Sequence, residues 1–505
     1  MARRALELGA AALVLAVTLG PIAAVLVWAG GLSALAPGDG QALRFTLVQA
    51  TLSAGFSILF AVPVARALAR RQFPGRGIFV ALLGAPFILP VIVAVLGLIA
   101  TFGSNGVVNR GLSALGLPEV SIYGLHGVVI AHVFFNLPLA TRLVLQGWLA
   151  MPGERLRLAG SLGLGPWAVF RLIELPMLAR ILPGVFAVIF VICLSSFAVA
   201  LTLGGGPKAT TVELAIYQAM RFDFDLGRAA TLSLIQLGLA LVAGLVALRL
   251  SSGTGFGVGL DRAAERWDSR TPVARGLDGL FILAAGLFLL TPLALLVVRG
   301  LPGLTQLGAG TWEAFFNSLW VALASTALCM AWALPLATRR GEVVGLLGIA
   351  LSPLVLGTGL FLILRSYVNP FSMALPVTML VNALVSLPFA LRILRPEAEA
   401  IRTDYRRVAL SLGMTPMAWV WLVFLPRLRR PIGFACGLTA ALSIGDLGVI
   451  ALFADPDRAT LPLQVFRLMG SYQMEAAQGA ALLLVTVSFA VFWLFDRGGR
   501  VNASA

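Results

Sequence analysis

The side chains that could carry out chemistry are few in this 505-residue chain. It has two histidines, and its three cysteines, Cys193, Cys329 and Cys436, lie far apart in long apolar stretches, where we expect them as small core residues. Its only lysine, Lys208, precedes Ala209, so a phosphate-binding GxxxxGK[ST] loop cannot form. The sequence therefore predicts no enzyme, no metal site and no nucleotide site on this chain.

A few polar side chains lie inside long apolar stretches, where they are costly and usually face a partner, a cavity or a transport path. Asp446 is the one carboxylate among them, and a second interpretation is that it caps a broken helix after Gly445. The others could equally bond helix to helix. The candidate path residues are His132, Asn136, Asn382, Ser386 and Asp446.

The elements that must position these residues are membrane-spanning helices. Of all residues, 59% are hydrophobic and only 12% are charged, far from the soluble average. Twelve stretches of about 20 apolar residues could each cross a hydrocarbon core as a helix, among them residues 78–102 and 343–364. We therefore expect an all-α polytopic membrane protein with about 12 transmembrane helices in contact with lipid.

The net charge of +15 could suggest binding to nucleic acid, but the positions of the charges indicate a membrane instead. When the N-terminus is placed inside, most of the 37 Lys and Arg residues fall on the cytoplasmic side. That distribution is what the positive-inside rule expects. The pattern predicts a multi-pass protein with both termini in the cytoplasm and no nucleic-acid partner.

The chain repeats itself with an offset close to 250 residues. "HVFFNLPLATR" at 132–142 matches "NALVSLPFALR" at 382–392, which places His132 and Asn136 over Asn382 and Ser386. Two parallel six-helix halves follow, residues 1–250 and 276–505, joined by a Gly-, Ser- and charge-rich cytoplasmic linker at 251–275.

One polar loop occurs in both halves, between the fourth and fifth helices. The first repeated loop (residues 155–176) contains "SLGLGPWAVF", and the second repeated loop (residues 405–426) contains "SLGMTPMAWV". In each, a short helical pattern reaches a glycine that precedes a Leu-Pro pair, which predicts a helix, a turn and a second helix entering the next span. A basic loop alone would satisfy the charge rule, but two matching copies favour a shared binding surface.

Both loops resemble the cytoplasmic coupling motif of ABC importer permeases, which has Glu-Ala-Ala, three further residues, Gly and a later Leu-Pro. Arg157 and Arg407 stand where that motif has its glutamate, so the acidic contacts differ here. The resemblance implies that the loops contact ATPase subunits through Ala159, Gly163, Pro176, Ala409, Gly413 and Pro426.

Over nearly the whole chain, the sequence resembles the fused two-domain permease of the bacterial thiamine and thiamine-pyrophosphate ABC importer. The stretches that carry this likeness begin at 73, 131, 203 and 442 and read "FPGR", "AHVFFNLPLATRLVLQ", "LGGGPKATTVELAIYQA" and "LSIGDLGVIALF". The resemblance implies a type I importer permease (MetI-like) fold with core regions at about 45–250 and 313–496. It also makes an acidic path lining such as Asp446 plausible, because thiamine carries a fixed positive charge.

The same resemblance implies the partners and the location. Two cytoplasmic ABC ATPase subunits would hold ATP and Mg²⁺, a periplasmic thiamine-binding protein would deliver the substrate, and this chain would need no cofactor. The complex would lie in the bacterial inner membrane and work by alternating access. Two alternatives remain open: an iron(III) or small-anion ABC importer permease, and an ion-coupled secondary transporter with 12 helices.

Overall fold

The computed structural model describes residues 2–29, 35–84, 88–250, 271–349, 352–453 and 458–500, and these residues form helices and no strands. Most of the expected linker, residues 251–270, lies outside them. The helices of the first half are α1 Ala2–Ala29, α2 Asp39–Arg70, α3 Arg76–Leu82, α4 Val91–Phe102, α5 Val107–Ala114, α6 Leu125–Leu149, α7 Gly153–Ser161, α8 Pro166–Val169, η2 Phe170–Glu174, α9 Leu175–Leu194, α10 Phe197–Leu203, η3 Pro207–Ala209, α11 Val212–Arg221 and α12 Leu226–Leu250. Those of the second half are α13 Pro272–Gly303, η5 Leu304–Gln306, α14 Ala309–Leu336, α15 Arg339–Ile349, α16 Pro353–Leu364, η6 Pro370–Met373, α17 Ala374–Ser411, α18 Pro416–Trp419, η7 Val420–Phe424, α19 Leu425–Ile444, α20 Gly448–Leu452, α21 Leu461–Gly470 and α22 Met474–Arg500.

Eleven helical segments of the described chain are long and apolar enough to cross a membrane, against the 12 that the sequence predicts. The difference lies at residues 343–364, where α15 ends at Ile349 and α16 begins at Pro353 with Ser352 as its N-cap. Proline favours the first turn of a new helix, and hydropathy alone does not report such a break. The expected third span is divided in the same way, into α3 and α4. The all-α, multi-span fold is confirmed.

The fifth span of each half is also broken, between α9 and α10 and between α19 and α20. A break frees backbone carbonyls, which need hydrogen-bond donors at membrane depth. In the first half, Gln49 Nε2 donates to the Cys193 carbonyl at 2.8 Å, and Gln236 Nε2 donates to the Leu194 carbonyl at 3.1 Å. These two buried glutamines therefore stabilise the break from α2 and α12.

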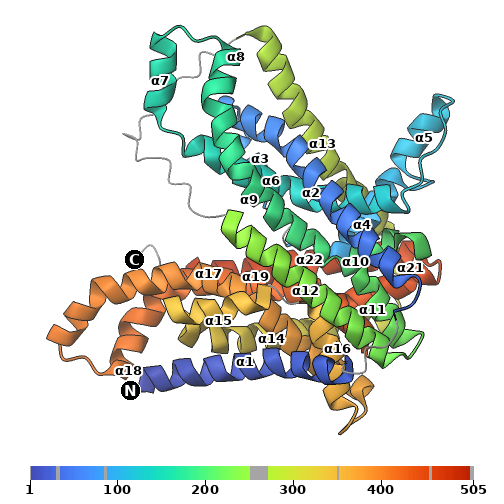
Figure 1. Ribbon diagram of the computed structural model, residues 1–505, viewed down its shortest axis with the longest axis vertical. Helices are drawn as coiled ribbons and strands as arrows, with labels where there is room; N and C mark the ends of the chain where they lie inside the picture. The colour runs from blue at the N-terminus through green and yellow to red at the C-terminus, as the bar shows by residue number, and fades with distance from the viewer. Residues whose placement is uncertain are drawn as a thin grey trace.

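The first helix of each half packs against the other half (Figure 1). Helix α1 lies against α14, α15 and α16 as well as α12, while α13 lies against α2 and α4 as well as α22. The same close contact occurs at both places: Gly97 of α4 lies against the Pro292 carbonyl of α13, and Gly359 of α16 lies against the Pro21 carbonyl of α1. Small residues permit this approach of two helix backbones.

Adding a methyl group at either glycine should destabilise the packing of α1 or α13 against the opposite half of the molecule. A Cβ at Gly97 would lie 2.6 Å from the Pro292 carbonyl oxygen, and one at Gly359 would meet the Pro21 carbonyl, so the helices must move apart. Overpacking of this kind costs about 1–3 kcal/mol. We expect Gly97→Ala and Gly359→Ala to lower the thermal unfolding temperature in detergent. Gly238→Ala is the control, because a Cβ there meets open space, and equal melting of all three variants would contradict the prediction.

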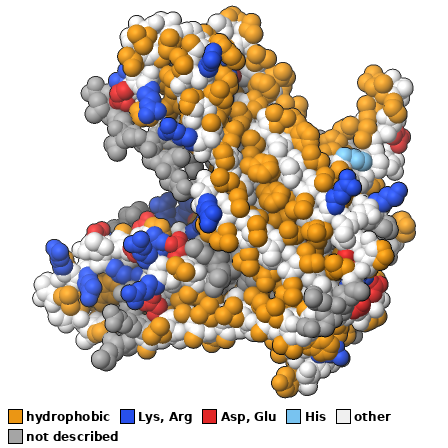
Figure 2. Space-filling model, viewed as in Figure 1, with side chains coloured by type: hydrophobic (Ala, Val, Ile, Leu, Met, Phe, Trp, Pro, Cys, Tyr) orange, Lys and Arg blue, Asp and Glu red, His pale blue; other side chains and the backbone are white. Residues whose placement is uncertain are grey.

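The two lobes of the molecule are separated by a hollow (Figure 2). The hollow opens on the side that carries both chain termini, α7, α8 and α18, and Lys and Arg side chains gather on both lobes at that side. Away from the hollow, α11 of the first half packs against α16 and α20 of the second half. The halves are therefore apart on the side of the repeated loops and in contact further along the spans.

Candidate functional site

The two repeated loops have the same course but differ in how they begin. The first is α7, Gly163, α8 and the π-helical turn η2, leading into α9. The second begins inside α17, a 38-residue helix that contains the whole fourth span and continues through Pro396 to Ser411. In the first half Pro152 is the N-cap of a separate helix, which explains the difference. The expected separate short helix is thus present in the first loop only.

The glycines end their helices in the same left-handed geometry. Gly163 and Gly413 have φ of 63° and 61°, in the left-handed region that disfavours a side chain. The amide of Leu164 donates to the Ala159 carbonyl at 3.0 Å, and the amide of Met414 does the same to Ala409. This pattern is a Schellman cap. The structure therefore brings the alanine and glycine of each motif together in one turn.

The prolines of the motif lie at the other end of each loop. Pro176 and Pro426 are the second residues of α9 and α19, which continue directly from the π-helical turns η2 and η7, so each proline lies inside a continuous helix next to a π-helical turn. Both are exposed, whereas Ala159 and Ala409 are buried at the base of the turn. The residues that the sequence singled out therefore hold the frame of each loop, and their contact with an ATPase stays a prediction.

Large apolar side chains are exposed on both loops, a feature that sequence reasoning missed. Trp167, in α8, is 72% exposed. Exposed apolar groups that gather in one patch mark a surface for another protein or a membrane. The exposed set is Leu158, Leu162, Trp167, Leu172 and Leu175 in the first loop and Val408, Leu410, Leu412, Met417, Trp421 and Leu422 in the second.

The loops are attached to the spans by different chemistry. In the first, Glu174 is fully buried and forms ion pairs with Arg66 at 2.7 Å and Arg70 at 3.8 Å, both from α2. In the second, Phe424 takes the place of Glu174, and the guanidinium of Arg402 lies 5.0 Å from its ring centroid. In the sequence, the signal that could have indicated this attachment is a glutamate inside an otherwise apolar run. The first loop is thus held by charge and the second by a cation–π contact.

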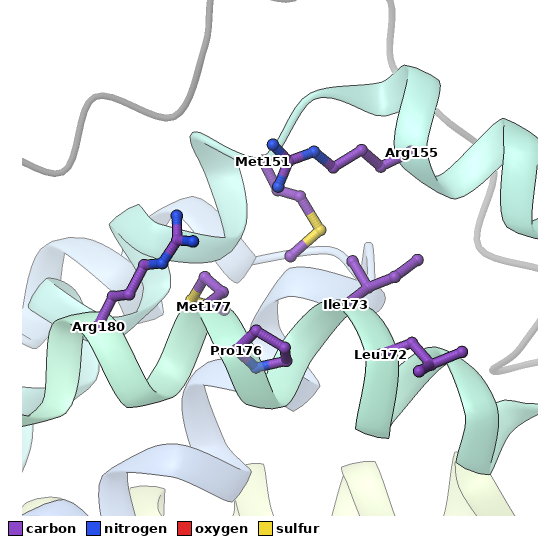
Figure 3. A pocket seen from close by; sticks show the side chains of 7 residues that line it. All are labelled: Met151, Arg155, Leu172, Ile173, Pro176, Met177 and Arg180. Atoms are coloured by element: carbon purple, nitrogen blue, oxygen red, sulfur yellow. The ribbon is translucent and has the colours of Figure 1, made fainter.

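A cavity of about 110 Å³ lies beneath the first loop (Figure 3). The side chains of Arg155 and Arg180 border it from α7 and α9, with Met151 and Met177 between them. Two of the corresponding positions in the second loop hold Tyr405 and Arg427, and the Arg427 guanidinium donates to the Tyr405 hydroxyl at 2.7 Å and lies 3.8 Å from its ring centroid. The two loops therefore present different surfaces.

Four of the candidate path residues, His132, Asn136, Asn382 and Ser386, are buried, and Asp446 is half-buried. His132 contacts the hydroxyl of Ser53 on α2 at 3.1 Å and that of Ser196, at the α9–α10 break, at 2.5 Å. Asn136 donates to the His132 carbonyl at 2.9 Å and to the Cys193 sulfur at 3.4 Å. These contacts bind α6 to α2 and α9.

The second half has an equivalent cluster. Asn382 Nδ2 donates to the Ser443 hydroxyl at 3.0 Å, and that hydroxyl also bonds Ser325 at 2.7 Å. Ser386 is buried one turn further along α17, and Asp446 Oδ1 accepts from the Gly448 amide at 3.2 Å in the α19–α20 break. Their role in a path stays a prediction. Within the described residues, no three His, Cys, Asp or Glu side chains could hold a metal ion.

The comparisons with known proteins assign this arrangement to a family. No family model matches the chain. The thiamine transport system permease protein ThiP of Brucella abortus is 39% identical over 481 residues, which cover 92% of this chain and 88% of that protein. The proteins of the same name from Salmonella typhimurium and Escherichia coli are 40% and 39% identical, and each match covers 90% of this chain and 88% of the relative.

The chain belongs to the ThiP family of transport permeases. The matched segments of these relatives include both repeated halves, since each covers about nine tenths of the chain. Membership of this family favours a permease over the ion-coupled carrier that the helix number alone also allowed.

Proposed function

We propose that this chain is the permease subunit of a bacterial inner-membrane ABC importer that moves thiamine and its phosphates into the cytoplasm. The observation that carries the proposal is the pair of repeated loops, each with a glycine-capped turn and exposed apolar side chains, in a chain of the ThiP family. Two loops with the same backbone course and the same glycine cap suit two ATPase subunits, which would hold ATP and Mg²⁺. This chain itself performs no catalysis and needs no cofactor.

The sidedness of the molecule supports the same mechanism. Both termini and both loops lie on the side where the hollow opens and where basic side chains gather, which the positive-inside rule places in the cytoplasm (Figures 1 and 2). The conformation is then inward-facing. Closure of the ATPase dimer would draw the loops together, close the hollow and open the outer side to a periplasmic thiamine-binding protein.

The deciding experiment is purification of the tagged chain in mild detergent, with mass spectrometry of the co-purifying proteins and an ATPase assay with added binding protein. We expect an ABC ATPase subunit and hydrolysis that thiamine stimulates. Stimulation by iron(III) or by sulfate in place of thiamine would support the alternative of an iron(III) or small-anion ABC importer. Ion-driven uptake by the chain alone, with no ATPase present, would refute the importer.

Replacement of Asp446 by asparagine should slow thiamine uptake several-fold at normal expression. The reason is that a carboxylate in a helix break at membrane depth offers the charge that a cationic substrate needs, while the amide oxygen of an asparagine there would still accept the bond from Gly448. Uptake of labelled thiamine into cells is the measurement. Unchanged uptake would remove Asp446 from the path and leave it as a cap of α20.

A further inference from the structure

One carboxylate lies buried in the contact between the two halves and takes no part in the mechanism above. Glu213, in the first turn of α11, is 1% exposed. Its Oε1 accepts hydrogen bonds from Ser352 Oγ at 2.5 Å and from Gln236 Nε2 at 3.4 Å. Ser352 belongs to the second half and begins α16, where its hydroxyl also accepts from the Leu354 amide at 3.2 Å. The contact therefore crosses the boundary between the halves.

Glu213 has no counterpart in the other half. The N-caps Thr211 and Thr460 align α11 with α21, and this alignment places Pro462 opposite Glu213. The residue at the start of α4 that corresponds to Ser352 is Pro90. Among the described residues, the contact between α11 and α16 thus has a carboxylate with no equivalent in the other half, which suits a single substrate in each transport cycle.

No Lys, Arg or His of the described chain forms an ion pair with this carboxylate. Helix α11 is not one of the spanning helices, and burial raises the pKa of Glu213 from 4.5 to about 7. In the conformation seen here burial therefore favours the protonated form of Glu213. An ionised carboxylate without a counter-charge is costly to bury, and two neutral hydrogen-bond donors offset that cost only in part.

Alternating access would change this environment. The halves are apart on the side of the repeated loops, and α11 packs against α16. Opening of the outer side between these two helices would separate Glu213 from Ser352. Once exposed to water, the carboxylate ionises at neutral pH because the desolvation that raised its pKa is removed. It would then face the path from outside as a free negative charge.

We propose that Glu213 binds the positively charged ring of the substrate when the outer side is open, and that Ser352 and Gln236 cover it in the inward-facing state. The inference rests on the proposed function, since thiamine supplies the fixed cation. Return to the inward-facing state would bring Ser352 back to the carboxylate, which displaces the cation toward the cytoplasm.

The test uses the complete importer in proteoliposomes, with ATPase and binding protein, and measures uptake of labelled thiamine by Glu213→Gln and Glu213→Asp. Gln keeps the length and the acceptor oxygen but loses the charge, whereas Asp keeps the charge and is too short to reach Ser352 in the same way. Binding of a cation therefore predicts at least tenfold slower uptake for E213Q than for E213D. A purely structural role predicts the reverse order, which would overturn the inference.

Two controls complete the design. Ser352→Ala removes the hydroxyl that bonds Glu213 and keeps the carboxylate, so we expect its uptake to be closer to that of the wild type than to that of E213Q. Uptake as low as that of E213Q would contradict a role for the charge of Glu213 in binding the substrate. The elution volume and the melting temperature of each variant in detergent, compared with those of the wild type, test whether the variant is folded. If the wild-type importer moves no thiamine at all, the proposed function itself has failed, whereas wild-type uptake with E213Q at or above E213D refutes only the role of Glu213.

Discussion

Gly163→Val should leave the protein folded in the membrane and uncouple ATP hydrolysis from transport, and Gly413→Val should do the same. At φ of 63° and 61° a β-branched residue is strained by about 1–2 kcal/mol or more, although there is open space around both positions. The turn must then unwind, and the exposed apolar side chains beside it change position. We expect at least tenfold lower uptake, with hydrolysis by the reconstituted complex largely retained.

The matched control for this experiment is Gly165→Val. Gly165 lies two residues after Gly163 in the first repeated loop and also has open space around it, but its φ of −69° suits any residue. Insertion and coupling should therefore survive in this variant. Normal thiamine uptake per ATP hydrolysed in both Gly163→Val and Gly413→Val would refute the coupling role of the loops.

Glu174→Ala should be the most destabilising substitution in the first repeated loop. It leaves Arg66 and the almost fully buried Arg70 without the carboxylate that lies 2.7 and 3.8 Å from them. Loss of one partner from a buried ion pair costs about 3–5 kcal/mol. We expect a lower melting temperature in detergent and a first loop that is cleaved faster by added protease.

The second loop provides the comparison for Glu174. Phe424→Leu removes the cation–π contact with Arg402, which is worth about 1 kcal/mol, and retains an apolar side chain of similar size. Its melting temperature should fall less than that of Glu174→Ala. A larger fall for Phe424→Leu would show that the charged attachment of the first loop is not the stronger one.

Much of the fold could be predicted from the sequence because membrane crossing imposes long apolar stretches and the repeat imposes their order. Gly163 and Gly413 could be identified as turn residues because only glycine enters the left-handed region without strain. The break before Pro353 was not predicted, since hydropathy averages over it. Spans are recognised by composition, whereas breaks depend on caps such as Ser352.

The contacts between helices could not be predicted, because they join residues far apart in the chain. Glu213 meets Ser352 across 139 positions, and Arg66 meets Glu174 across 108. His132 and Asn382 stand out in the sequence because polar residues in spans are rare, but their partners Ser53 and Ser443 come from other helices. Pairing of this kind follows from packing geometry, which a single sequence does not contain.

The contacts of α1 and α13 have a consequence for how the protein is made. While the ribosome is completing the first half, the surface of α4 around Gly97 has no partner, because α13 has not yet been synthesised. Helix α1 is synthesised first, but most of its neighbours, including α14 and α16, are synthesised only with the second half. Each half therefore completes its packing only when the other is present, and premature termination would yield a half in which α1 and α4 lack neighbours that the other half supplies.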